Sequence, residues 1–403
     1  MTEINEVSEK KTQNILSEIG QLVVKNIRDY MMYIVLVGII IFFTVTTDGS
    51  FISAGNISNL FNQAAYVAVL AIGMTVILIL RQIDLSVGYV AGFSGAVCAI
   101  LLTNYGWPVW IVIPLVILIG VFIGFYQGML VTGVGVPAFV TTLAGMFIFR
   151  GLLGVATSKT GTIIIKNKAY LALNNGFIPD FKNDTGYHLV TIFIGIVAVV
   201  CVLVTQIQNR KSKEKYNFNV VSMPIFVVGM ILVSCVIMLI ITVLAKDQGI
   251  PWSAVIVAVV LLCYNFILNK TRLGRYVYGI GGNDQAAELS GVNVKKVTLI
   301  AFMAMSGLAA LAGILYSSRL ASATPTAGNA FEMDAIASSY IGGVAVSGGV
   351  GKVTNTIIGT LVIMSLTNGM NLMGVDTFMQ YIVKGIIFIL AVAFDVTTRR
   401  KNR

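Results

Sequence analysis

Side chains that could do chemistry are few in this chain, and the largest group of them lies at residues 278–297, YGIGGNDQAAELSGVNVKKV. This stretch separates two long apolar runs and combines a glycine-rich turn, a short helix pattern and two lysines. Asn283 or Asp284 can cap a new helix, because a side-chain oxygen there meets free N–H groups and the positive end of the helix dipole. Gly291 is the expected stop. Since a helix this short is not stable alone in water, we expect it to dock on something. An ordinary interfacial turn is the alternative.

A second polar interruption, RQIDLSVG at residues 81–88, places Asp84 between two apolar runs. Asp84 is positioned to cap the helix that begins LSVGYVAG. A role in proton or ion coupling would require a deep position in the membrane, where a charge costs at least about 2.5 kcal/mol and usually has a function. The place of Asp84 at a helix end favours capping. Lys384 lies in a later apolar run, and we interpret it as a residue that extends its ammonium group to the membrane surface.

A third candidate is the glycine-rich run DAIASSYIGGVAVSGGV at residues 334–350, which is followed by GKVT. The end of it resembles a phosphate-binding loop, but Val346 stands where the first glycine is required and Val353 replaces the Ser or Thr after Lys352. The glycines instead predict a break between two helices, where freed backbone is tolerated only if protein or a water cavity covers it. The candidates for the helix break and the pathway are therefore Asp84, Gly342, Gly343, Gly348, Gly349 and Gly351.

Groups typical of catalysis or metal binding are missing from the sequence. No pair of carboxylates lies in the middle of an apolar run, and the single histidine cannot form a cluster. The cysteines, Cys98, Cys201, Cys235 and Cys263, lie in apolar segments without CxxC pairing and are typical of small buried hydrophobic residues. We expect no catalytic residue, no metal site and no cofactor, so the chain is not expected to be an enzyme.

The composition predicts the elements that position these residues. Of 403 residues, 57% are hydrophobic and only 11% are charged, whereas a soluble domain carries about 25% charged residues. The apolar runs are continuous and long, which is typical of membrane helices, and the alternation of a membrane β-barrel is absent. The formal net charge of +10 lies in short clusters beside the apolar runs, as membrane topology requires. The prediction is an all-α integral membrane protein that binds lipid and no nucleic acid.

About 10–12 transmembrane helices are predicted, each with about 17 or more mostly apolar residues. The expected spans are 30–47, 64–81, 85–104, 109–131, 137–157, 188–207, 220–245, 252–269, 298–317, 353–372 and 378–397. A weaker twelfth candidate, 334–350, either crosses the membrane or dips in and returns. If 334–350 crosses and the N-terminus is cytoplasmic, most of the 27 Lys and Arg residues lie inside. Both termini are then expected to be cytoplasmic.

The expected organisation follows from these spans. A cytoplasmic N-terminal segment covers 1–29 and contains no apolar run, so it is not a signal peptide. A single polytopic membrane domain covers 30–397, and a basic cytoplasmic tail covers 398–403. The domain contains a cytoplasmic loop at 271–297 and an outer loop at 158–187. Residues 208–217, QNRKSKEKYN, are expected to form a solvated turn. No soluble domain fits, so any energy source must come from another chain.

Several stretches together resemble one family. NDQAAELSG after GRYVYGIGG resembles the cytoplasmic coupling segment of permease subunits from bacterial ABC importers of the ribose/xylose/galactose branch. NISNLFNQAAYVAVLAIGMTVILI, IDLSVGYVAGFSGAV, VPAFVTTLAGMFIFRG and GNAFEMDAIASSYIGGVAVSGGVGKVTNTIIGTLV are similar to the same branch, in the same order. The chain length and the extra segment around 200–250 look like the xylose-type or multiple-monosaccharide permeases. RQIDLSVG departs from the family, which more often has small residues before IDLSVG.

The resemblance implies a permease in the bacterial plasma membrane that carries monosaccharides, with D-xylose as the first candidate and several pentoses or hexoses as the second. It also implies three partners: cytoplasmic ATPase subunits that hydrolyse ATP, an extracytoplasmic sugar-binding protein and a second copy of the permease. The ATPase would bind the short helix in a groove, through Asn283, Asp284, Gln285, Ala286, Ala287, Glu288, Leu289, Ser290 and Gly291. The alternatives are a secondary transporter or channel that works without an ATPase, and a membrane scaffold. Asn62 and Gln63 are candidates for the outer mouth, with helix-interface hydrogen bonds as the alternative.

Overall fold

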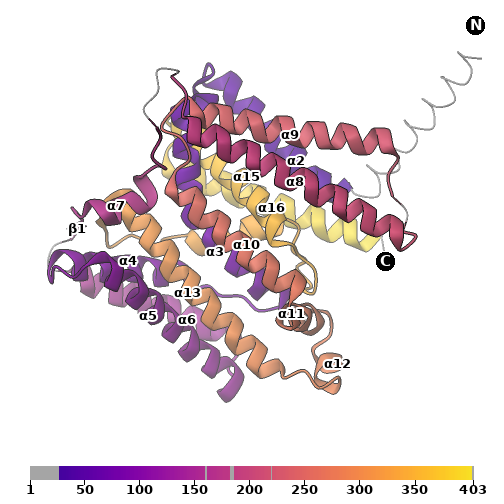
Figure 1. Cartoon of the computed structure of the whole chain (residues 1–403). Coiled ribbons are helices and arrows are strands. Elements are labelled where there is room, and N and C mark those ends of the chain that lie inside the picture. The colour runs from indigo at the N-terminus through magenta and orange to yellow at the C-terminus, as the bar shows by residue number, and fades with distance from the viewer. Residues whose placement is uncertain (1–26, 159–160, 182–185, 219, 402–403) are drawn as a thin grey trace, which may run out of the picture. The chain divides into compact units, whose positions relative to one another are not determined.

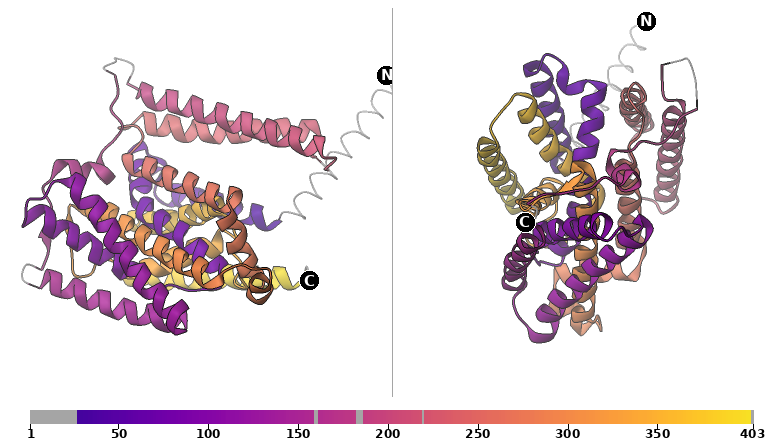
Figure 2. Two further views of the ribbon diagram at one scale, coloured as in Figure 1. Left: turned by 60° about the horizontal axis from the view of Figure 1, so that its bottom comes forward. Right: turned by 90° about the vertical axis from the view of Figure 1, so that its left-hand side faces the viewer.

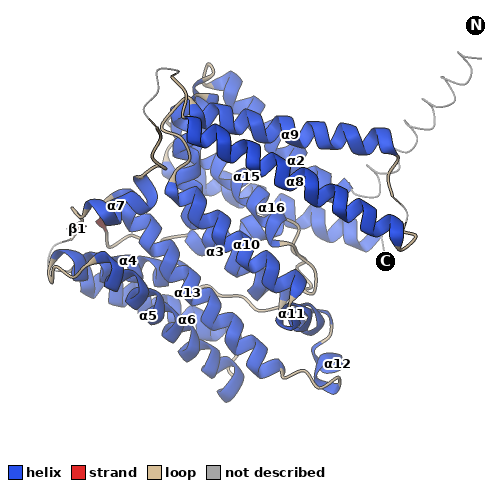
Figure 3. Cartoon of the chain, in the orientation of Figure 1, coloured by secondary structure: helices blue, strands red, loops and turns tan. Residues whose placement is uncertain are grey.

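The computed structural model describes residues 27–158, 161–181, 186–218 and 220–401, and most of these residues are helical (Figure 3). Eight helices of the described part are long and apolar enough to cross a membrane, and three shorter apolar helices accompany them. These observations confirm the prediction of an all-α membrane protein. Most of the predicted N-terminal segment 1–29 and the end of the tail 398–403 lie outside the described residues.

The chain divides into two compact units. The smaller comprises 1–34, 53–58 and 177–250, and the larger comprises 35–52, 59–176 and 251–403. The elements, in chain order, are α2 (Ile27–Thr46), η1 (Ser50–Ile52), α3 (Ala54–Ile79), α4 (Val87–Thr103), α5 (Val109–Met129), the π-helix η2 (Leu130–Val134), α6 (Ala138–Thr157), β1 (Ile163–Ile164), α7 (Lys168–Asn175), α8 (Leu189–Lys215), α9 (Met223–Ala245), α10 (Trp252–Lys270), α11 (Arg272–Gly282), α12 (Asp284–Leu289), α13 (Val294–Leu320), β2 (Ser322–Ala323), α14 (Phe331–Ile341), α15 (Val353–Leu372) and α16 (Thr377–Lys401).

The core of the larger unit is built on α13, which packs against α5 and α4 (Figure 1). Small residues bring these helices together, because lipid gives no hydrophobic drive for helix pairing and close backbone contact must replace it. A side chain at Gly124 of α5 would collide with the carbonyl oxygen of Phe302 on α13. A side chain at Gly313 of α13 would collide with the carbonyl oxygen of Ala91 on α4. The glycine-rich helix faces therefore position the centre of the unit.

The larger unit has two distinct ends. At one end, β1 and β2 form a short antiparallel ribbon in which Ile163 pairs with Ala323 and Ile164 with Ser322. At the other end lie α11, α12 and the beginning of α13 (Figure 1). We call these the ribbon end and the α12 end. With 27 residues, α13 runs between them over about 40 Å, which exceeds the membrane core of about 30 Å.

The segment between β2 and α15 crosses the larger unit without forming a continuous membrane helix. It leaves the ribbon end after Ala323, and at the α12 end the backbone N–H of Gly349 donates to the carbonyl oxygen of Ile79, 2.9 Å away. Only the 11 residues of α14 are helical in between, or about 16 Å, which is too short to span the core. The run 334–350 is therefore not one continuous membrane helix.

Several helices are longer than the apolar runs that predicted them. α8 continues to Lys215, so the solvated turn predicted at 208–217 is wrong over most of its length. α3 begins at Ala54 rather than at residue 64, and α13 extends in both directions beyond 298–317. Polar side chains at the ends of a long helix reach water and do not stop the backbone from continuing, so hydropathy marks only the apolar middle.

The smaller unit contains the antiparallel hairpin of α8 and α9, which the left panel of Figure 2 shows from the side. Gly195 of α8 allows close approach, because a side chain there would meet Ile241 of α9. His188 caps α8, its Nδ1 accepting from the backbone N–H of Thr191 at 3.3 Å. The carboxylate of Asp180 accepts from the N–H groups of Leu189 and Val190, at 2.8 and 3.0 Å, and so satisfies two further free donors of that helix start.

Candidate functional site

The short helix α12 lies outside the apolar spans, at the predicted residues. Oδ1 of Asn283 accepts from the backbone N–H of Ala286 at 2.9 Å, so Asn283 rather than Asp284 is the cap. The helix ends after Leu289, and Gly291 adopts a left-handed conformation with φ of +83°. The next helix, α13, starts immediately afterwards under its own cap, in which Oδ1 of Asn293 accepts from the N–H of Lys296 at 2.9 Å.

The exposed face of α12 carries an isolated leucine. Leu289 is 90% exposed, whereas Ala287 is buried in its own unit and keeps only 8% of its surface exposed. Asp284, Gln285, Ala286, Glu288 and Ser290 are also exposed. An exposed apolar side chain gains free energy when a partner covers it. α12 therefore offers a small protruding contact of one leucine within a polar rim.

The glycines before α12 have a role that differs from the prediction. A glycine-rich turn was predicted in this stretch, but Gly279, Gly281 and Gly282 all lie within α11. A side chain at Gly281 would collide with the carbonyl oxygen of Ile79 and would lie 2.7 Å from the backbone nitrogen of Gly349. Gly281 is thus required by close packing of three backbone segments and not by a turn.

The predicted helix break lies between the end of α14 at Ile341 and the start of α15 at Val353. Gly343, Gly348 and Gly349 adopt positive φ values of +87°, +74° and +71°, which other residues rarely adopt. Gly342 ends α14 and lies so close to α15 that a side chain on it would be 2.6 Å from the Cα of Thr356. These residues turn the chain where a helix would otherwise continue.

The backbone of the break is hydrogen-bonded inside the protein. The N–H of Ala345 donates to the carbonyl of Val350 at 2.9 Å, and the N–H of Val344 donates to Ser339 at 3.1 Å. Gly351 accepts a hydrogen bond from the hydroxyl of Tyr278 on α11 at 2.7 Å. Irregular backbone at membrane depth requires such internal partners. The break is therefore a built feature that joins the α12 end of the unit.

Asp84 is fully buried in the loop between α3 and α4. Its Oδ1 accepts from the backbone N–H of Ser86 at 2.9 Å and from the hydroxyl of Ser86 at 2.6 Å. Ser86, not Asp84, is the residue that precedes α4, so the carboxylate shapes the loop before the helix and does not cap the helix directly. Ser86 also pairs with Gln127 of α5. Oδ2 of Asp84 has no hydrogen-bond partner among the described residues.

The structure contains a buried ion pair that was not predicted from the sequence. The Nζ of Lys384 on α16 lies 3.0 Å from Oδ1 of Asp334 on α14, and both side chains are less than a fifth exposed. The interpretation of Lys384 as a residue that reaches to the membrane surface is therefore wrong. Two opposite charges in separate apolar or glycine-rich segments could have suggested the pair, since an isolated charge at such a position is costly.

Other polar groups of the larger unit surround the beginning of α14. Glu332 is only 7% exposed, and its Oε2 has no hydrogen-bond partner in the described part of the chain. Next to it, the rings of Tyr66, Tyr316 and Phe331 contact one another with centroid distances of 4.7 to 5.1 Å. No sequence motif predicted this aromatic group, because its members come from three separate segments.

Asn62 and Gln63 lie in helix interfaces. Oδ1 of Asn62 accepts from the hydroxyl of Ser253 on α10 at 2.6 Å, and Oε1 of Gln63 lies 3.5 Å from the amide nitrogen of Asn368 on α15. The alternative interpretation, a hydrogen bond at a helix interface, therefore accounts for Asn62. In the described residues, no three His, Cys, Asp or Glu side chains come together as a metal site.

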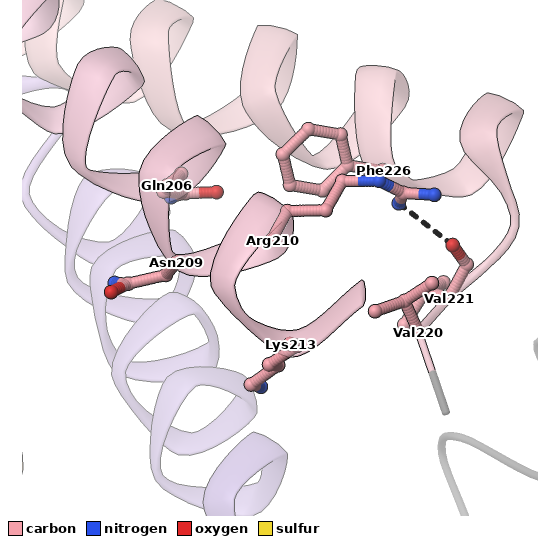
Figure 4. A pocket seen from close by; sticks show the side chains of 7 residues that line it. All are labelled: Gln206, Asn209, Arg210, Lys213, Val220, Val221 and Phe226. Carbon is pink, nitrogen blue, oxygen red and sulfur yellow. Dashed lines mark hydrogen bonds between the residues drawn. The ribbon is translucent and has the colours of Figure 1, made fainter. Parts of the chain in front are cut away.

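A hollow of about 220 Å³ lies within the α8–α9 hairpin of the smaller unit (Figure 4). Its central residue is Arg210, which donates to the carbonyl of Val221 at 2.8 Å and lies 2.9 Å from Glu214. The guanidinium also lies 4.8 Å from the ring centre of Phe226. The remaining lining residues are Gln206, Asn209, Lys213 and Val220. These contacts engage Arg210 within the hairpin and hold the end of α8 against the beginning of α9.

The fold and the site define a class of protein: a multi-pass membrane protein whose helices surround a broken crossing and whose short polar helix stands outside the apolar spans. Such an arrangement is that of a transmembrane permease. The family described as "Branched-chain amino acid transport system / permease component" matches residues 56–392, and the chain belongs to this family.

The chain is similar to permeases named for xylose and for ribose. The chain is 37% identical to the xylose transport system permease protein XylH of Escherichia coli (strain K12), over 94% of each chain. It is 38% identical to XylH of Haemophilus influenzae, over 93% of this chain and 98% of the relative. The ribose import permease protein RbsC of Escherichia coli (strain K12) is 30% identical, over 87% and 88%. No solved structure matches the chain. The predicted resemblance to the ribose/xylose branch, nearest to the xylose type, is confirmed.

Proposed function

We propose that this permease forms the pathway of an ATP-driven monosaccharide importer in the bacterial plasma membrane, with D-xylose as its first candidate substrate. The observation that carries the proposal is the greater identity to xylose permeases, 37% and 38%, than to the ribose permease, 30%, over nearly whole chains. A range of several pentoses or hexoses is the second candidate. The permease itself is not an enzyme, and a separate ATPase hydrolyses ATP.

The ATPase contact is proposed at Asn283–Gly291. The exposed Leu289 within a polar rim, and the rigid caps on both sides of α12, support this role. A preformed helix loses little conformational freedom on binding, so a small contact can be sufficient to transmit movement. On this proposal the α12 end faces the cytoplasm. α15 leads away from the break at that end and α16 leads back, so the C-terminus of α16 lies at the α12 end as well.

An extracytoplasmic sugar-binding protein is proposed to dock at the ribbon end, and a second copy of the permease is proposed to complete the pathway within the lipid. The helix break at Gly342, Gly343, Gly348, Gly349 and Gly351, together with Asp84, is the proposed element that moves during transport. Packed segments with two discrete arrangements are the usual means by which binding at one site opens another.

A secondary transporter that works without an ATPase is the alternative function. One observation favours it: the buried carboxylates of Asp84 and Glu332 each have one oxygen without a hydrogen-bond partner in the described part of the chain. Buried ionisable groups of this kind occur in proton relays. The alternative, however, leaves the exposed α12 without a role.

The test is uptake of radiolabelled xylose, galactose and ribose by proteoliposomes that contain the permease. Each sugar is measured with and without ATP, the ATPase and the binding protein that its operon or neighbourhood encodes. Uptake that requires all three additions supports the proposal, and the sugar that is transported fastest identifies the substrate. Uptake by the permease alone under a proton or sodium gradient contradicts the proposal and supports the alternative.

A further inference from the structure

We propose that Arg81 is the positioning residue that couples α12 to the broken crossing, so that the end of α3, the end of α11 and the glycine break move as one body when the ATPase displaces α12. This inference rests on the proposed function, because it names the path by which movement of α12 reaches the pathway. Arg81 itself touches neither the sugar nor the ATPase on this proposal.

The first observation is the pair of hydrogen bonds that Arg81 makes. It stands two residues after the end of α3, and its Nε donates to the carbonyl oxygen of Ser347 in the break at 2.8 Å. Its second guanidinium nitrogen, Nη2, donates to the carbonyl oxygen of Gly282 at 2.6 Å. Gly282 is the last residue of α11 and is separated from α12 by Asn283 alone. One side chain therefore joins three segments that are far apart in the chain, because the two bonds span 266 and 201 residues.

The second observation is the backbone of Arg81. Its φ of +61° lies in the left-handed region, which residues other than glycine, asparagine and aspartate seldom adopt. A strained conformation persists only where the surrounding structure determines it. Here the positive φ turns the chain at the end of α3, and the hydrogen bonds to Ser347 and Gly282 hold the side chain across the junction.

The third observation is close backbone contact beneath the guanidinium. The N–H of Gly349 donates to Ile79 at 2.9 Å, and Gly281 has no space for a side chain between those two residues. The hydroxyl of Tyr278, one turn earlier in α11, donates to the carbonyl of Gly351 at 2.7 Å. Segments in such contact cannot slide by small amounts, because packed interiors have low compressibility. Displacement of α12 is therefore passed to the break, and through the break to α14 and α15.

The fourth consideration is chemical. The two carbonyl oxygens that Arg81 binds belong to separate segments, and a planar guanidinium presents several donors in fixed directions. A lysine at this position keeps the positive charge but has one compact ammonium group, which cannot donate to both carbonyl oxygens in the directions that the guanidinium provides. Arg81→Lys thus separates the geometry of the bridge from its charge.

The experiment compares Arg81→Lys with Arg275→Lys in the complete importer, reconstituted with the ATPase and the binding protein. Arg275 is an exposed arginine of α11, the helix whose last residue Arg81 binds, and serves as the control. The readouts are the number of xylose molecules transported per ATP hydrolysed and the amount of ATPase that co-purifies with the permease. A variant that merely unfolds would lose the ATPase as well.

The expected result is that Arg81→Lys keeps its abundance and its bound ATPase but transports about fivefold or more less xylose per ATP, the lower end of typical coupling strengths. Tyr278→Phe, which removes the second hydrogen bond from α11 to the break, is expected to lower the same ratio in the same direction. An unchanged ratio in Arg81→Lys, with ATP-dependent uptake by the wild type, overturns this inference and leaves the importer function intact. Wild-type uptake that needs no ATPase overturns both.

Discussion

At the scale of single residues, the buried ion pair between Lys384 and Asp334 is the most unusual feature of the larger unit. Both side chains are largely buried, and the two charges come from α16 and from the half-length helix α14. Removing charges from water costs several kcal/mol per ion, so such a pair is stable only while both partners are present. The pair therefore fixes the position of α14, which lacks the length to be held by lipid alone.

We expect Lys384→Met to lower the stability of the permease by about 3 kcal/mol, because it leaves Asp334 buried without its counter-ion. The double variant Lys384→Met with Asp334→Asn removes both charges and is expected to recover most of this loss. Thermal unfolding of the purified protein in detergent, followed for both variants and the wild type, measures the difference. If the double variant unfolds as early as the single variant, the ion pair does not explain the loss.

At the scale of elements, α12 and α11 illustrate how few side chains connect a surface helix to the membrane domain. α12 is exposed along most of its length, and its only buried member is Ala287. α11 is close-packed at Gly281 but open at Gly279, where nothing lies within 4 Å of an added side chain. These contrasts give two predictions, one for docking and one for packing.

The docking prediction concerns the exposed leucine. Leu289→Asp is expected to weaken the contact with the ATPase by about 2 kcal/mol, the free energy of burying a leucine, which is roughly thirtyfold in affinity. Glu288→Lys in the same rim is expected to act in the same direction. The amount of ATPase that co-purifies with each variant is the measurement, and Leu320→Asp, at the ribbon end of α13 and 41% exposed, is the control. Equal recovery of the ATPase with Leu289→Asp and Leu320→Asp would contradict the docking role.

The packing prediction uses two glycines of one helix. Gly281→Ala is expected to destabilise the permease by about 1–3 kcal/mol, because its side chain collides with the backbone of Ile79 and Gly349. Gly279→Ala is expected to be neutral or to stabilise by up to about 1 kcal/mol, since alanine favours the helix and has free space. Unfolding temperatures of the two variants should therefore differ in opposite directions from the wild type. Equal unfolding temperatures for Gly281→Ala and Gly279→Ala would show that the neighbouring backbone moves to make room for a side chain at residue 281.

At the scale of the whole molecule, the sequence predicted the membrane class and most crossings, because lipid imposes long apolar runs that can be read directly. It also located α12, whose cap and glycine stop are local signals. It did not reveal the half-length of α14, the inward position of Ala287 or the Lys384–Asp334 pair. These features depend on contacts between segments far apart in the chain, which no local pattern encodes.

The hydrogen bonds of Arg81 to Ser347 and Gly282 are a further example of contacts that no local pattern predicts. From the sequence, RQIDLSVG is a departure from the family pattern, and the functional role in this stretch was assigned to Asp84. In the structure, the arginine joins three segments while Asp84 shapes a local loop through Ser86. Arg81, the residue that departs from the family pattern, thus makes long-range contacts that Asp84 does not make. Only the fold shows that its partners are Ser347 and Gly282.

The half-length of α14 also has a consequence while the chain is being made. The insertion machinery selects segments by their apolar character over about 20 residues, and the 11 helical residues of α14 fall short of that. Asp334 on α14 gains its counter-ion only after Lys384 of α16, near the end of the chain, has been made. We therefore expect this crossing to be the last to settle during biogenesis. Weakening it would then first appear as rapid degradation of newly made protein, before any loss of transport by the mature permease.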